Sequence, residues 1–502
     1  MEGARITGQL DLEGARIPRD ILLINCRFDA APILRSAMLD TVSLQGSALP
    51  GFHGDRLSAR GCVMLRECEV TEELLLSRAT LGGDLSCLNA HLRAGESGDA
   101  LFADGLDAKG GVFLQGVVAT GALRLLGATL GGDLNCENVR LTAGKSGAVL
   151  SADRLNTKGT VFLRGAIAEG EMRFIGAQIG GDLGCNGARF TARTDGRALS
   201  LDSARINGTV FLRGGARLQG TFGLSGAVIG QISDDPKSWP QKQGDLLLNR
   251  CRYGAFVGTG TPVDAPSRTR WLSLQEESRW GQEFWPQPWE HCAKVLREMG
   301  HREDARTILI EKEKRQRAAR RERMRKDALY EDAAWYGVWD TVLGWTVRYG
   351  RQPLLAFVWL FAFWLMGCAI YWKAGQEDAI KPNNPFVLRS AEWAYCAPEY
   401  APQSTDARLA PRNAGETQRA CFEQQAEAQS YPRFNPLIYS ADTLLPIVHL
   451  EMQEYWIPNE TAASPWGQGA RIFLWAQIAL GWALSLLAVA GFSGLVKTDS
   501  GT

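Results

Sequence analysis

Apolar and polar residues alternate along the first half of the chain in short segments of one kind. Between about residues 5 and 253, each segment of about eleven residues has apolar residues two apart, then a small pair such as Gly-Ala, and often a glycine. A period of two is typical of β-strands, and glycine readily adopts the positive φ of tight turns. Each segment is therefore expected to form a short strand and a turn.

These segments recur in a longer unit of 49 residues. Thr80–Cys87 returns as Thr129–Cys136 and, more loosely, as Gln178–Cys185. Four segments and a five-residue insert make one unit, which predicts two coils of about 22 residues and a loop projecting from every second coil. We expect a mainly β N-terminal half, a right-handed β-helix or solenoid over residues 1–254, with coils about 4.8 Å apart. The pattern leaves the register between residues 29 and 61 open.

The stretch Asp11-Leu12-Glu13-Gly14-Ala15-Arg16-Ile17 carries the resemblance to a known family. It resembles pentapeptide-repeat sequence, with a unit of eleven residues in place of five. The resemblance implies a β-helix related to that fold.

Three cysteines occupy equivalent places in the repeat, Cys87, Cys136 and Cys185. On the coil geometry they stand about 10 Å apart, which is beyond the ~7 Å between Cα atoms that a disulfide allows. Zinc sites place cysteines a few residues apart, and the chain has no CxxC or HExxH motif. We therefore predict that the three pack in the core, and we expect no metal and no cofactor.

An aspartate follows each Gly-Gly pair of the repeat, at Asp84, Asp133 and Asp182. Repeat calcium sites need a denser Gly-Asp pattern with a nine-residue period. One aspartate in every two coils is more typical of a turn residue that bonds local backbone amides. Calcium binding stays open as the less favoured alternative.

The second half of the chain contains two long apolar runs. Pro353–Trp372 and Ile472–Val496 have no charged residue, and a helix of about twenty apolar residues spans a bilayer core. We expect transmembrane helices at 353–372 and 471–496, with buried core helices as the alternative. The net charge of zero and the 45% hydrophobic content give no hint of this, because the apolar residues are concentrated locally.

A basic stretch precedes the first apolar run. By the positive-inside rule it places the N-terminal half and the C-terminus in the cytoplasm of a multi-pass inner-membrane protein. Anionic lipid headgroups are its favoured partner, a solvated helix face is the alternative, and nucleic acid is the least favoured. Its basic residues are Lys312, Lys314, Arg315, Arg317, Arg320, Arg321, Arg323, Arg325 and Lys326.

The remaining segments connect these parts. Residues 255–285 are expected to form a linker, and 286–330 a helical hairpin with the basic helix, which resembles a single tetratricopeptide-type hairpin. An aromatic-rich interfacial helix is expected at 331–352. Residues 373–433 form an extracytoplasmic loop, where an oxidising compartment could join Cys396 to Cys421.

A short apolar segment at 434–450 lies between the two predicted spans and is too short to cross a membrane. Either it re-enters the membrane, or it rests on the outer surface as an amphipathic helix with its polar residues in water, which we favour. The candidate functional residues are Asp442, Thr443, Pro446 and His449, because ionisable and polar groups at membrane depth are usually functional.

The layout of two spans around this segment resembles the pore module of potassium-channel-like proteins, carried by Tyr439–Leu444 at the position of a pore-helix end. Leu445-Pro446-Ile447-Val448 stands where that family has its glycine-tyrosine-glycine filter, so potassium selectivity is not implied. The whole order of segments also resembles a group of bacterial membrane proteins with a β-helix and paired spans. No activity is implied by that resemblance.

Two functions are compatible with these patterns. The first is a non-enzymatic scaffold, anchored in the bacterial inner membrane, whose β-helix binds a protein partner. The second is an oligomeric two-span pore or channel gated by the β-helix. An enzyme is not expected, because the chain has no phosphate-binding loop, no nucleophile elbow and only five scattered histidines. A catalytic site assembled from distant residues on the solenoid surface is the less favoured alternative.

Overall fold

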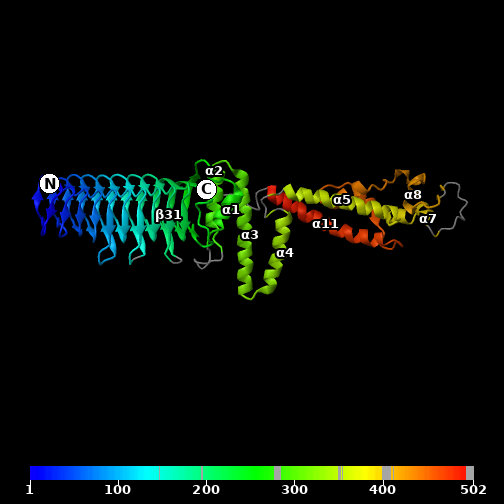
Figure 1. Ribbon diagram of the computed structural model, residues 1–502. Coiled ribbons are helices and arrows are strands. Elements are labelled where there is room, and N and C mark those ends of the chain that lie inside the picture. The colour runs from blue at the N-terminus through cyan, green and yellow to red at the C-terminus, as the bar shows by residue number, and fades with distance from the viewer. Residues whose placement is uncertain are drawn as a thin grey trace. The chain divides into compact units, whose positions relative to one another are not determined.

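Short parallel strands, most of them two or three residues long, make up the first half of the chain (Figure 1). The computed structural model describes residues 1–145, 147–193, 196–275, 284–346, 348, 352, 354–397, 399, 409–410 and 412–492. The chain forms two units, Met1–Arg323 and Met324–Thr502. The first contains the parallel strands and a helical end, and the second is almost wholly helical.

Within the described residues, successive coils contribute their strands to three parallel sheets. The first sheet contains β1 (Arg5–Ile6), β4 (Arg27–Phe28), β7 (Ala48–Leu49), β11 (Glu69–Val70), β15 (His91–Arg93), β19 (Val118–Thr120), β23 (Arg140–Thr142), β27 (Ile167–Glu169), β31 (Arg189–Thr191) and β34 (Arg217–Gln219). The second contains β8 (Phe52–His53), β12 (Leu74–Leu75), β16 (Asp99–Phe102), β20 (Ala122–Arg124), β24 (Ala148–Ser151), β28 (Glu171–Arg173), β32 (Arg197–Ser200), β35 (Thr221–Gly223) and β37 (Leu246–Leu247).

The third sheet joins two ladders that merge toward its end. One ladder contains β2 (Arg16–Ile17), β5 (Met38–Leu39), β9 (Ser58–Ala59), β13 (Thr80–Leu81), β17 (Asp107–Ala108), β21 (Thr129–Leu130), β25 (Asn156–Thr157), β29 (Gln178–Ile179), β33 (Arg205–Leu212), β36 (Val228–Asp234) and β38 (Arg252–Phe256). The other contains β3 (Ile21–Leu22), β6 (Val42–Ser43), β10 (Val63–Met64), β14 (Leu85–Ser86), β18 (Val112–Phe113), β22 (Leu134–Asn135), β26 (Val161–Phe162) and β30 (Leu183–Gly184), and it also ends on β33.

The strand register explains the 49-residue repeat. Glu69 pairs with His91, 22 residues later, and His91 pairs with Val118, 27 residues later. The extra residues of the longer coils form loops at every second coil, as expected from the sequence. The register also continues through the segment that the pattern left open, where Met38 pairs with Ser58. The first unit is therefore a solenoid-like stack of coils.

The prediction of one strand per eleven-residue segment was wrong. Two strands such as β12 and β13 lie within one segment and are joined by a tight turn. The turn residue has a positive φ and recurs about every eleven residues, as at Glu67 (56°), Arg78 (54°) and Asn89 (53°). The eleven-residue period therefore reports the spacing of left-handed turns, and each coil contains four short strands.

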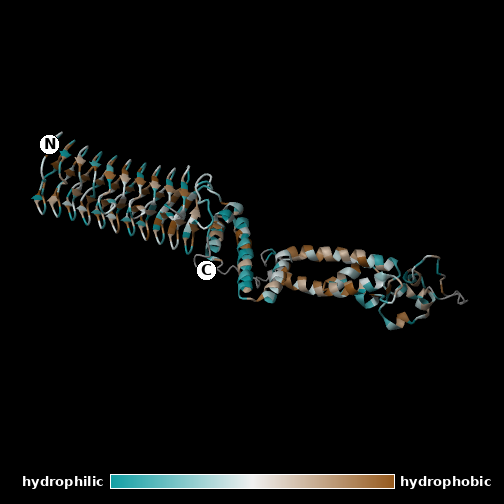
Figure 2. Ribbon diagram, turned by 60° about the horizontal axis from the view of Figure 1, so that its bottom comes forward, coloured by the Kyte–Doolittle hydropathy of each residue, from teal (hydrophilic) through white to brown (hydrophobic). Residues whose placement is uncertain are grey.

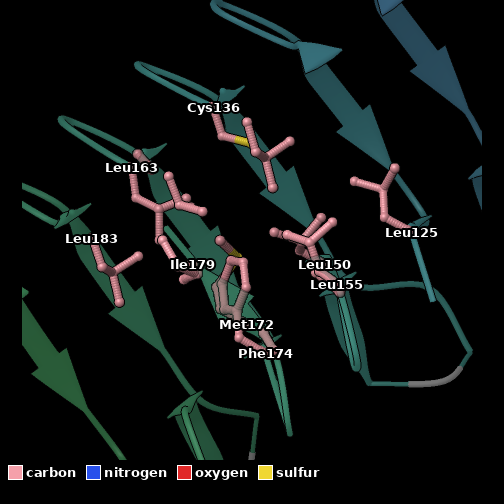
Figure 3. Close-up of a cluster of buried hydrophobic side chains, with 14 of the residues drawn as sticks. Leu125, Cys136, Leu150, Leu155, Leu163, Met172, Phe174, Ile179 and Leu183 are labelled. Carbon is pink, nitrogen blue, oxygen red and sulfur yellow. The ribbon is translucent and has the colours of Figure 1, made fainter. Parts of the chain in front are cut away.

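A column of interior side chains alternates leucine with cysteine. Leu114, Cys136, Leu163 and Cys185 come from successive coils and are fully buried. Figure 3 shows Cys136 and Leu163 of this column. Alternation of a large and a small side chain lets successive layers fill the same interior space. Burial raises the pKa of the Cys136 and Cys185 thiols to about 12, so they stay protonated. The cysteines of the repeat are core residues, as predicted.

The Gly-Gly-Asp corner, which occurs on every second coil, fastens that coil to both of its neighbours. A Cβ atom on Gly131 would lie 2.0 Å from the carbonyl oxygen of Lys109 in the preceding coil. Asp133 Oδ1 accepts a hydrogen bond of 2.7 Å from the backbone amide of Thr160 in the following coil. The aspartates of the other two repeats make the same bond. They therefore bond the next coil rather than the local amides that we expected.

Helix α2 (Gln287–Glu298) covers the free edge of the last coil. Gln287 Oε1 accepts a hydrogen bond from the amide of Arg250, and His291 Nε2 accepts one from the amide of Tyr253. Burial lowers the pKa of His291, which favours the neutral ring that this bond requires. An uncovered sheet edge would leave these amides without partners.

The segment expected to be a linker, 255–285, is not one. It begins with the end of β38 and contains helix α1 (Ala265–Leu272), while residues 276–283 lie outside the described part of the chain. Arg268 of α1 is fully buried and forms a bidentate ion pair with Asp234, with both N–O distances 2.8 Å. Helix α3 (Arg302–Lys326) completes the helical end and is joined to α2 by an ion pair between Lys312 and Glu290. Apolar side chains of all three helices join the core of the coils, among them Trp271, Trp289, Leu296 and Ile308.

The second unit contains the two long apolar helices, α5 (Leu354–Gln376) and α11 (Pro465–Phe492), close to the predicted bounds (Figures 1 and 2). Helix α4 (Tyr330–Thr346) precedes them where the aromatic helix was expected, and residues 347, 349–351 and 353 lie outside the described part. The segment expected to be a loop contains several short elements. They are β39 (Ile380–Pro382), α6 (Pro385–Leu388), α7 (Ala391–Tyr395), α8 (Gln418–Glu423) and the 3-10 helix η2 (Glu427–Ser430), followed by α9 (Pro436–Leu444), α10 (Met452–Tyr455) and β40 (Trp456–Pro458).

A Gly131→Ala substitution is expected to lower the free energy of unfolding by about 1–3 kcal/mol, because the new methyl group would push two coils apart at a backbone atom. Gly184→Ala is the matched control, since its Cβ would meet only one atom, at 4.0 Å. Thermal unfolding of the full chain, followed by circular dichroism, measures both. Equal melting temperatures for the two variants would contradict the close contact between coils.

Candidate functional site

Helices α5 and α11 are each long and apolar enough to cross a membrane. They pack side by side along their length (Figure 1), and only 28% of the residues in each apolar window are buried inside the unit. A core helix of a water-soluble protein would be mostly buried. Large exposed side chains such as Phe361 (58%) and Leu486 (61%) therefore suit a lipid environment.

Helix α9 lies between these two helices and follows much of the length of α5. It begins next to Phe434, which lies against Gly375 in the last turn of α5. It ends at Leu444, which packs with Leu360 near the start of α5 and with Leu484 of α11. The favoured interpretation, a surface helix with its polar residues in water, is wrong, because Ser440, Asp442 and Thr443 are buried.

Gln477 of α11 holds α9 in place through a buried polar cluster. Its Nε2 donates to Ser440 Oγ at 2.9 Å, and its Oε1 accepts from Thr443 Oγ1 at 3.0 Å. Oε1 also accepts from the Tyr371 hydroxyl of α5 at 2.9 Å. The amide side chain of Gln477 therefore links α11 to both α5 and α9. Ser440 Oγ also donates a hydrogen bond to the carbonyl oxygen of Trp364 in α5. Unpaired polar groups would be costly in this setting.

Two glycines allow α9 to approach so closely. A Cβ on Gly367 of α5 would lie 2.2 Å from Ser440 Oγ and 2.6 Å from Gln477 Nε2. A Cβ on Gly481 of α11 would lie 2.0 Å from the backbone oxygen of Leu444. Small residues at helix contacts of this kind are typical of membrane proteins.

The chain after α9 is irregular, and Asp442 organises it. We call Leu445–Glu451 the return loop. The Asp442 carboxylate accepts hydrogen bonds from the amides of Leu450 and Gln453, both at 2.8 Å. Asp442 is only 7% exposed, so its charge is satisfied within the protein and does not face an open space. It positions the loop.

The second part of the return loop, from Ile447 to Glu451, has exposed side chains. Ile447 is 77% exposed and Val448 47% exposed, and the side chains of His449 and Glu451 are exposed as well. Pro446 is half-buried. Of the four candidate residues, the structure therefore brings Asp442 and Thr443 into the packed interior and leaves His449 on the surface of the loop.

A second, smaller core lies at the C-terminal end of α5. Cys396 and Cys421 form a disulfide there, with Cα atoms 5.7 Å apart, as the sequence allowed. Strands β39 and β40 pair antiparallel beside it, and Trp456 is fully buried. This core fixes the two ends of the α9 segment relative to α5.

The basic stretch differs from its prediction most clearly at Lys312. Lys312 is only 6% exposed, and its Nζ lies 2.8 Å from Glu290 and 3.4 Å from Glu313. It belongs to the contact between α2 and α3 and does not face a membrane surface. Arg315 is also paired, with Glu311 at 3.0 Å. For the other members of the stretch, contact with lipid headgroups stays a prediction.

Comparisons with protein-family models, curated proteins and solved structures gave no match to this chain. Among the residues that the structure describes, no group of three or more His, Cys, Asp or Glu side chains is arranged to hold a metal ion. The site is therefore defined by α9, the return loop and the polar cluster around Gln477.

Sequence reasoning missed Gln477, Tyr371 and the two glycines as parts of this site. Gln477 did stand out as one of the few polar residues in an apolar run of 25. A polar side chain inside a predicted span usually faces other protein groups, and that signal could have placed α9 against it. The partners Ser440 and Thr443 gave no comparable signal.

We expect Gly367→Ala to displace α9 and to destabilise the second unit by about 1–3 kcal/mol, because the new methyl group overlaps Ser440 and Gln477. Gly469→Ala, also in a long apolar helix, is the control, since nothing lies within 4 Å of its Cβ position. Limited proteolysis in detergent micelles would measure cleavage within the return loop. Faster cleavage in Gly367→Ala alone is expected, and unchanged cleavage would contradict the packing described here.

Proposed function

We propose that this chain is an integral membrane protein whose α5–α9–α11 module assembles into an oligomeric pore, with the solenoid-like region as its cytoplasmic binding or regulatory part. One observation carries the proposal. An irregular return loop with exposed His449 and Glu451 follows a buried helix that reaches deep between two helices of membrane-spanning length.

The physical argument is one of solvation. Hydrocarbon cannot satisfy backbone amides and carbonyls, so irregular chain at membrane depth must be buried in protein or line a water-filled space. A charged side chain such as Glu451 adds several kcal/mol to that cost at the bilayer centre. A single copy of the module leaves this loop uncovered. A ring of copies around a water-filled axis would supply both protein contact and water.

The orientation follows from charge and from redox chemistry. Arg320, Arg321 and Arg323 precede α5, and the positive-inside rule favours the cytoplasm for this side. The Cys396–Cys421 disulfide lies beyond the other end of α5 and suits an oxidising compartment. Both arguments support an inner-membrane protein of a bacterium, with the coils, proposed to be a right-handed β-helix, in the cytoplasm. We propose no enzymatic role and no cofactor.

A second candidate is a membrane-anchored scaffold, which one feature of the coils favours. A phenylalanine recurs on every second coil, at Phe113, Phe162 and Phe211. Each has a buried residue before and after it in the chain, so its side chain points outward. Smaller residues, Asn135 and Gly184, occupy the coils between them. Such a row of half-buried aromatic side chains suits recognition of a protein partner.

Conductance in planar bilayers tests the pore. The purified full-length chain is expected to conduct under voltage or membrane tension, and Gly367→Ala is expected to reduce the conductance severalfold by displacing α9 and the return loop. Gly469→Ala should leave it unchanged. Silence of the unsubstituted chain under both stimuli would reject the pore and leave the scaffold as the better account.

A further inference from the structure

Large apolar side chains stand at a fixed spacing along the outside of the coils. We call this set the outer row, and its members are Met64, Phe113, Phe162 and Phe211. The strand register places a smaller residue between each two of them: Ser86, Asn135 and Gly184. Neighbouring members are therefore two inter-strand spacings apart, about 9.6 Å. A Cβ atom on Gly184 would meet only one atom, at 4.0 Å, so the space above this residue is open.

The backbone beneath the outer row offers no free strand edge. Strands β14, β18, β22 and β26 each pair with a coil on both sides. A peptide that approaches this face cannot extend the sheet, because the ladder is already occupied. It must bind through side chains, and the repeat of its own side chains has to match the spacing of the row.

The spacing distinguishes between the regular conformations of a bound peptide. In an extended strand, side chains on one face repeat at about 6.7 Å, which does not match. Two turns of an α-helix advance about 10.8 Å, so a helix would be out of register by roughly 3–4 Å over the three intervals of the row. Three residues of polyproline II advance about 9.3 Å, and the mismatch over the same length is only about 1 Å. The row therefore matches a polyproline II helix.

Exposed basic side chains flank the outer row on both sides. They come four residues before a member, at Arg60, Lys109 and Lys158, or two residues after one, at Arg66 and Arg164. Three of them have carboxylate neighbours, but these surface ion pairs are weak. The aspartates of the Gly-Gly-Asp corners are half-buried and bond backbone amides. The charges that face solvent beside the row are therefore mainly positive, and they complement acidic residues on a partner.

We propose that the outer row binds an acidic, proline-rich segment of a protein partner in the polyproline II conformation. One proline in every three residues lies between two members of the row, as proline-rich segments do on aromatic-lined surfaces. The basic side chains bond the acidic residues and the backbone carbonyls, which have no partners within a polyproline II helix. This inference deepens the scaffold candidate by naming the class of partner, and it does not depend on the pore.

The test is fluorescence anisotropy of labelled peptides with the full-length chain in detergent. A peptide of four Pro-Pro-Glu repeats is expected to bind about tenfold more tightly than two control peptides. Gly-Gly-Glu repeats keep the charge and lose the polyproline II conformation, while Pro-Pro-Lys repeats keep the conformation and reverse the charge. Labelled oligothymidylate tests nucleic acid as the alternative ligand of a basic and aromatic surface.

Two substitutions test the row itself. Phe162→Ala is expected to weaken binding of the Pro-Pro-Glu peptide about tenfold, and Val118→Ala, at an exposed apolar residue of the first sheet, is the control that should leave it unchanged. Gly184→Leu fills the open space between Phe162 and Phe211. It is expected to weaken binding about tenfold although it adds apolar surface, whereas unspecific hydrophobic contact would become stronger.

Equal binding of the Pro-Pro-Glu and Gly-Gly-Glu peptides would overturn the proposal, as would unchanged or tighter binding by Gly184→Leu. Absence of peptide binding to the unsubstituted chain would also reject it, and so would Phe162-dependent binding of oligothymidylate in its place. Melting temperatures show whether each variant is folded; should Phe162→Ala unfold, Gly184→Leu and the control peptides decide. A chain that conducts but does not bind the peptide would keep the pore and reject this inference, and a silent chain that binds it would do the reverse.

Discussion

A backbone amide that leaves water must find another partner, and this constraint governs both units of the chain. In the coils, strand amides bond carbonyls of the neighbouring coil, and the last coil obtains partners from side chains of α2 such as Gln287 and His291. In the second unit, the amides of Leu450 and Gln453 obtain theirs from Asp442. The groups of the return loop that one copy leaves exposed are the basis of the functional proposal.

The repeat and the apolar runs could be predicted from the sequence because they are periodic or long. The 49-residue repeat follows from alternating coils of 22 and 27 residues, and both kinds of coil are visible as spacing. The number of strands in each coil was not visible, because a two-residue strand has no period of its own. The turn residues also hid it, since Arg78 and Glu67 occupy positive φ where a glycine would be expected.

The candidate site was predictable in position but not in packing. The length and location of residues 434–450 indicated a distinct segment between two spans. Its polar residues were equally compatible with exposure to water and with a buried hydrogen-bonded cluster. To distinguish a surface helix from a buried one, Gln477 has to be placed against α9, although it lies 34 residues beyond Thr443 in the sequence. Long-range pairing of that kind has no local signature. The same holds for Arg268 and Asp234, also 34 residues apart, whose buried ion pair joins a segment that looked like a linker to the coils.

The environment of the return loop in a bilayer tests the central claim most directly. A spin label at Ile447→Cys in the full-length chain, reconstituted in lipid nanodiscs, would report its collisions with oxygen, which concentrates in lipid, and with a water-soluble nickel chelate. A label at Phe361→Cys, on the exposed face of α5, gives the lipid reference, and the unsubstituted chain gives the background from native cysteines. The account predicts low oxygen and high chelate accessibility at position 447, the reverse of position 361. Equal, lipid-like accessibility at both positions would contradict it.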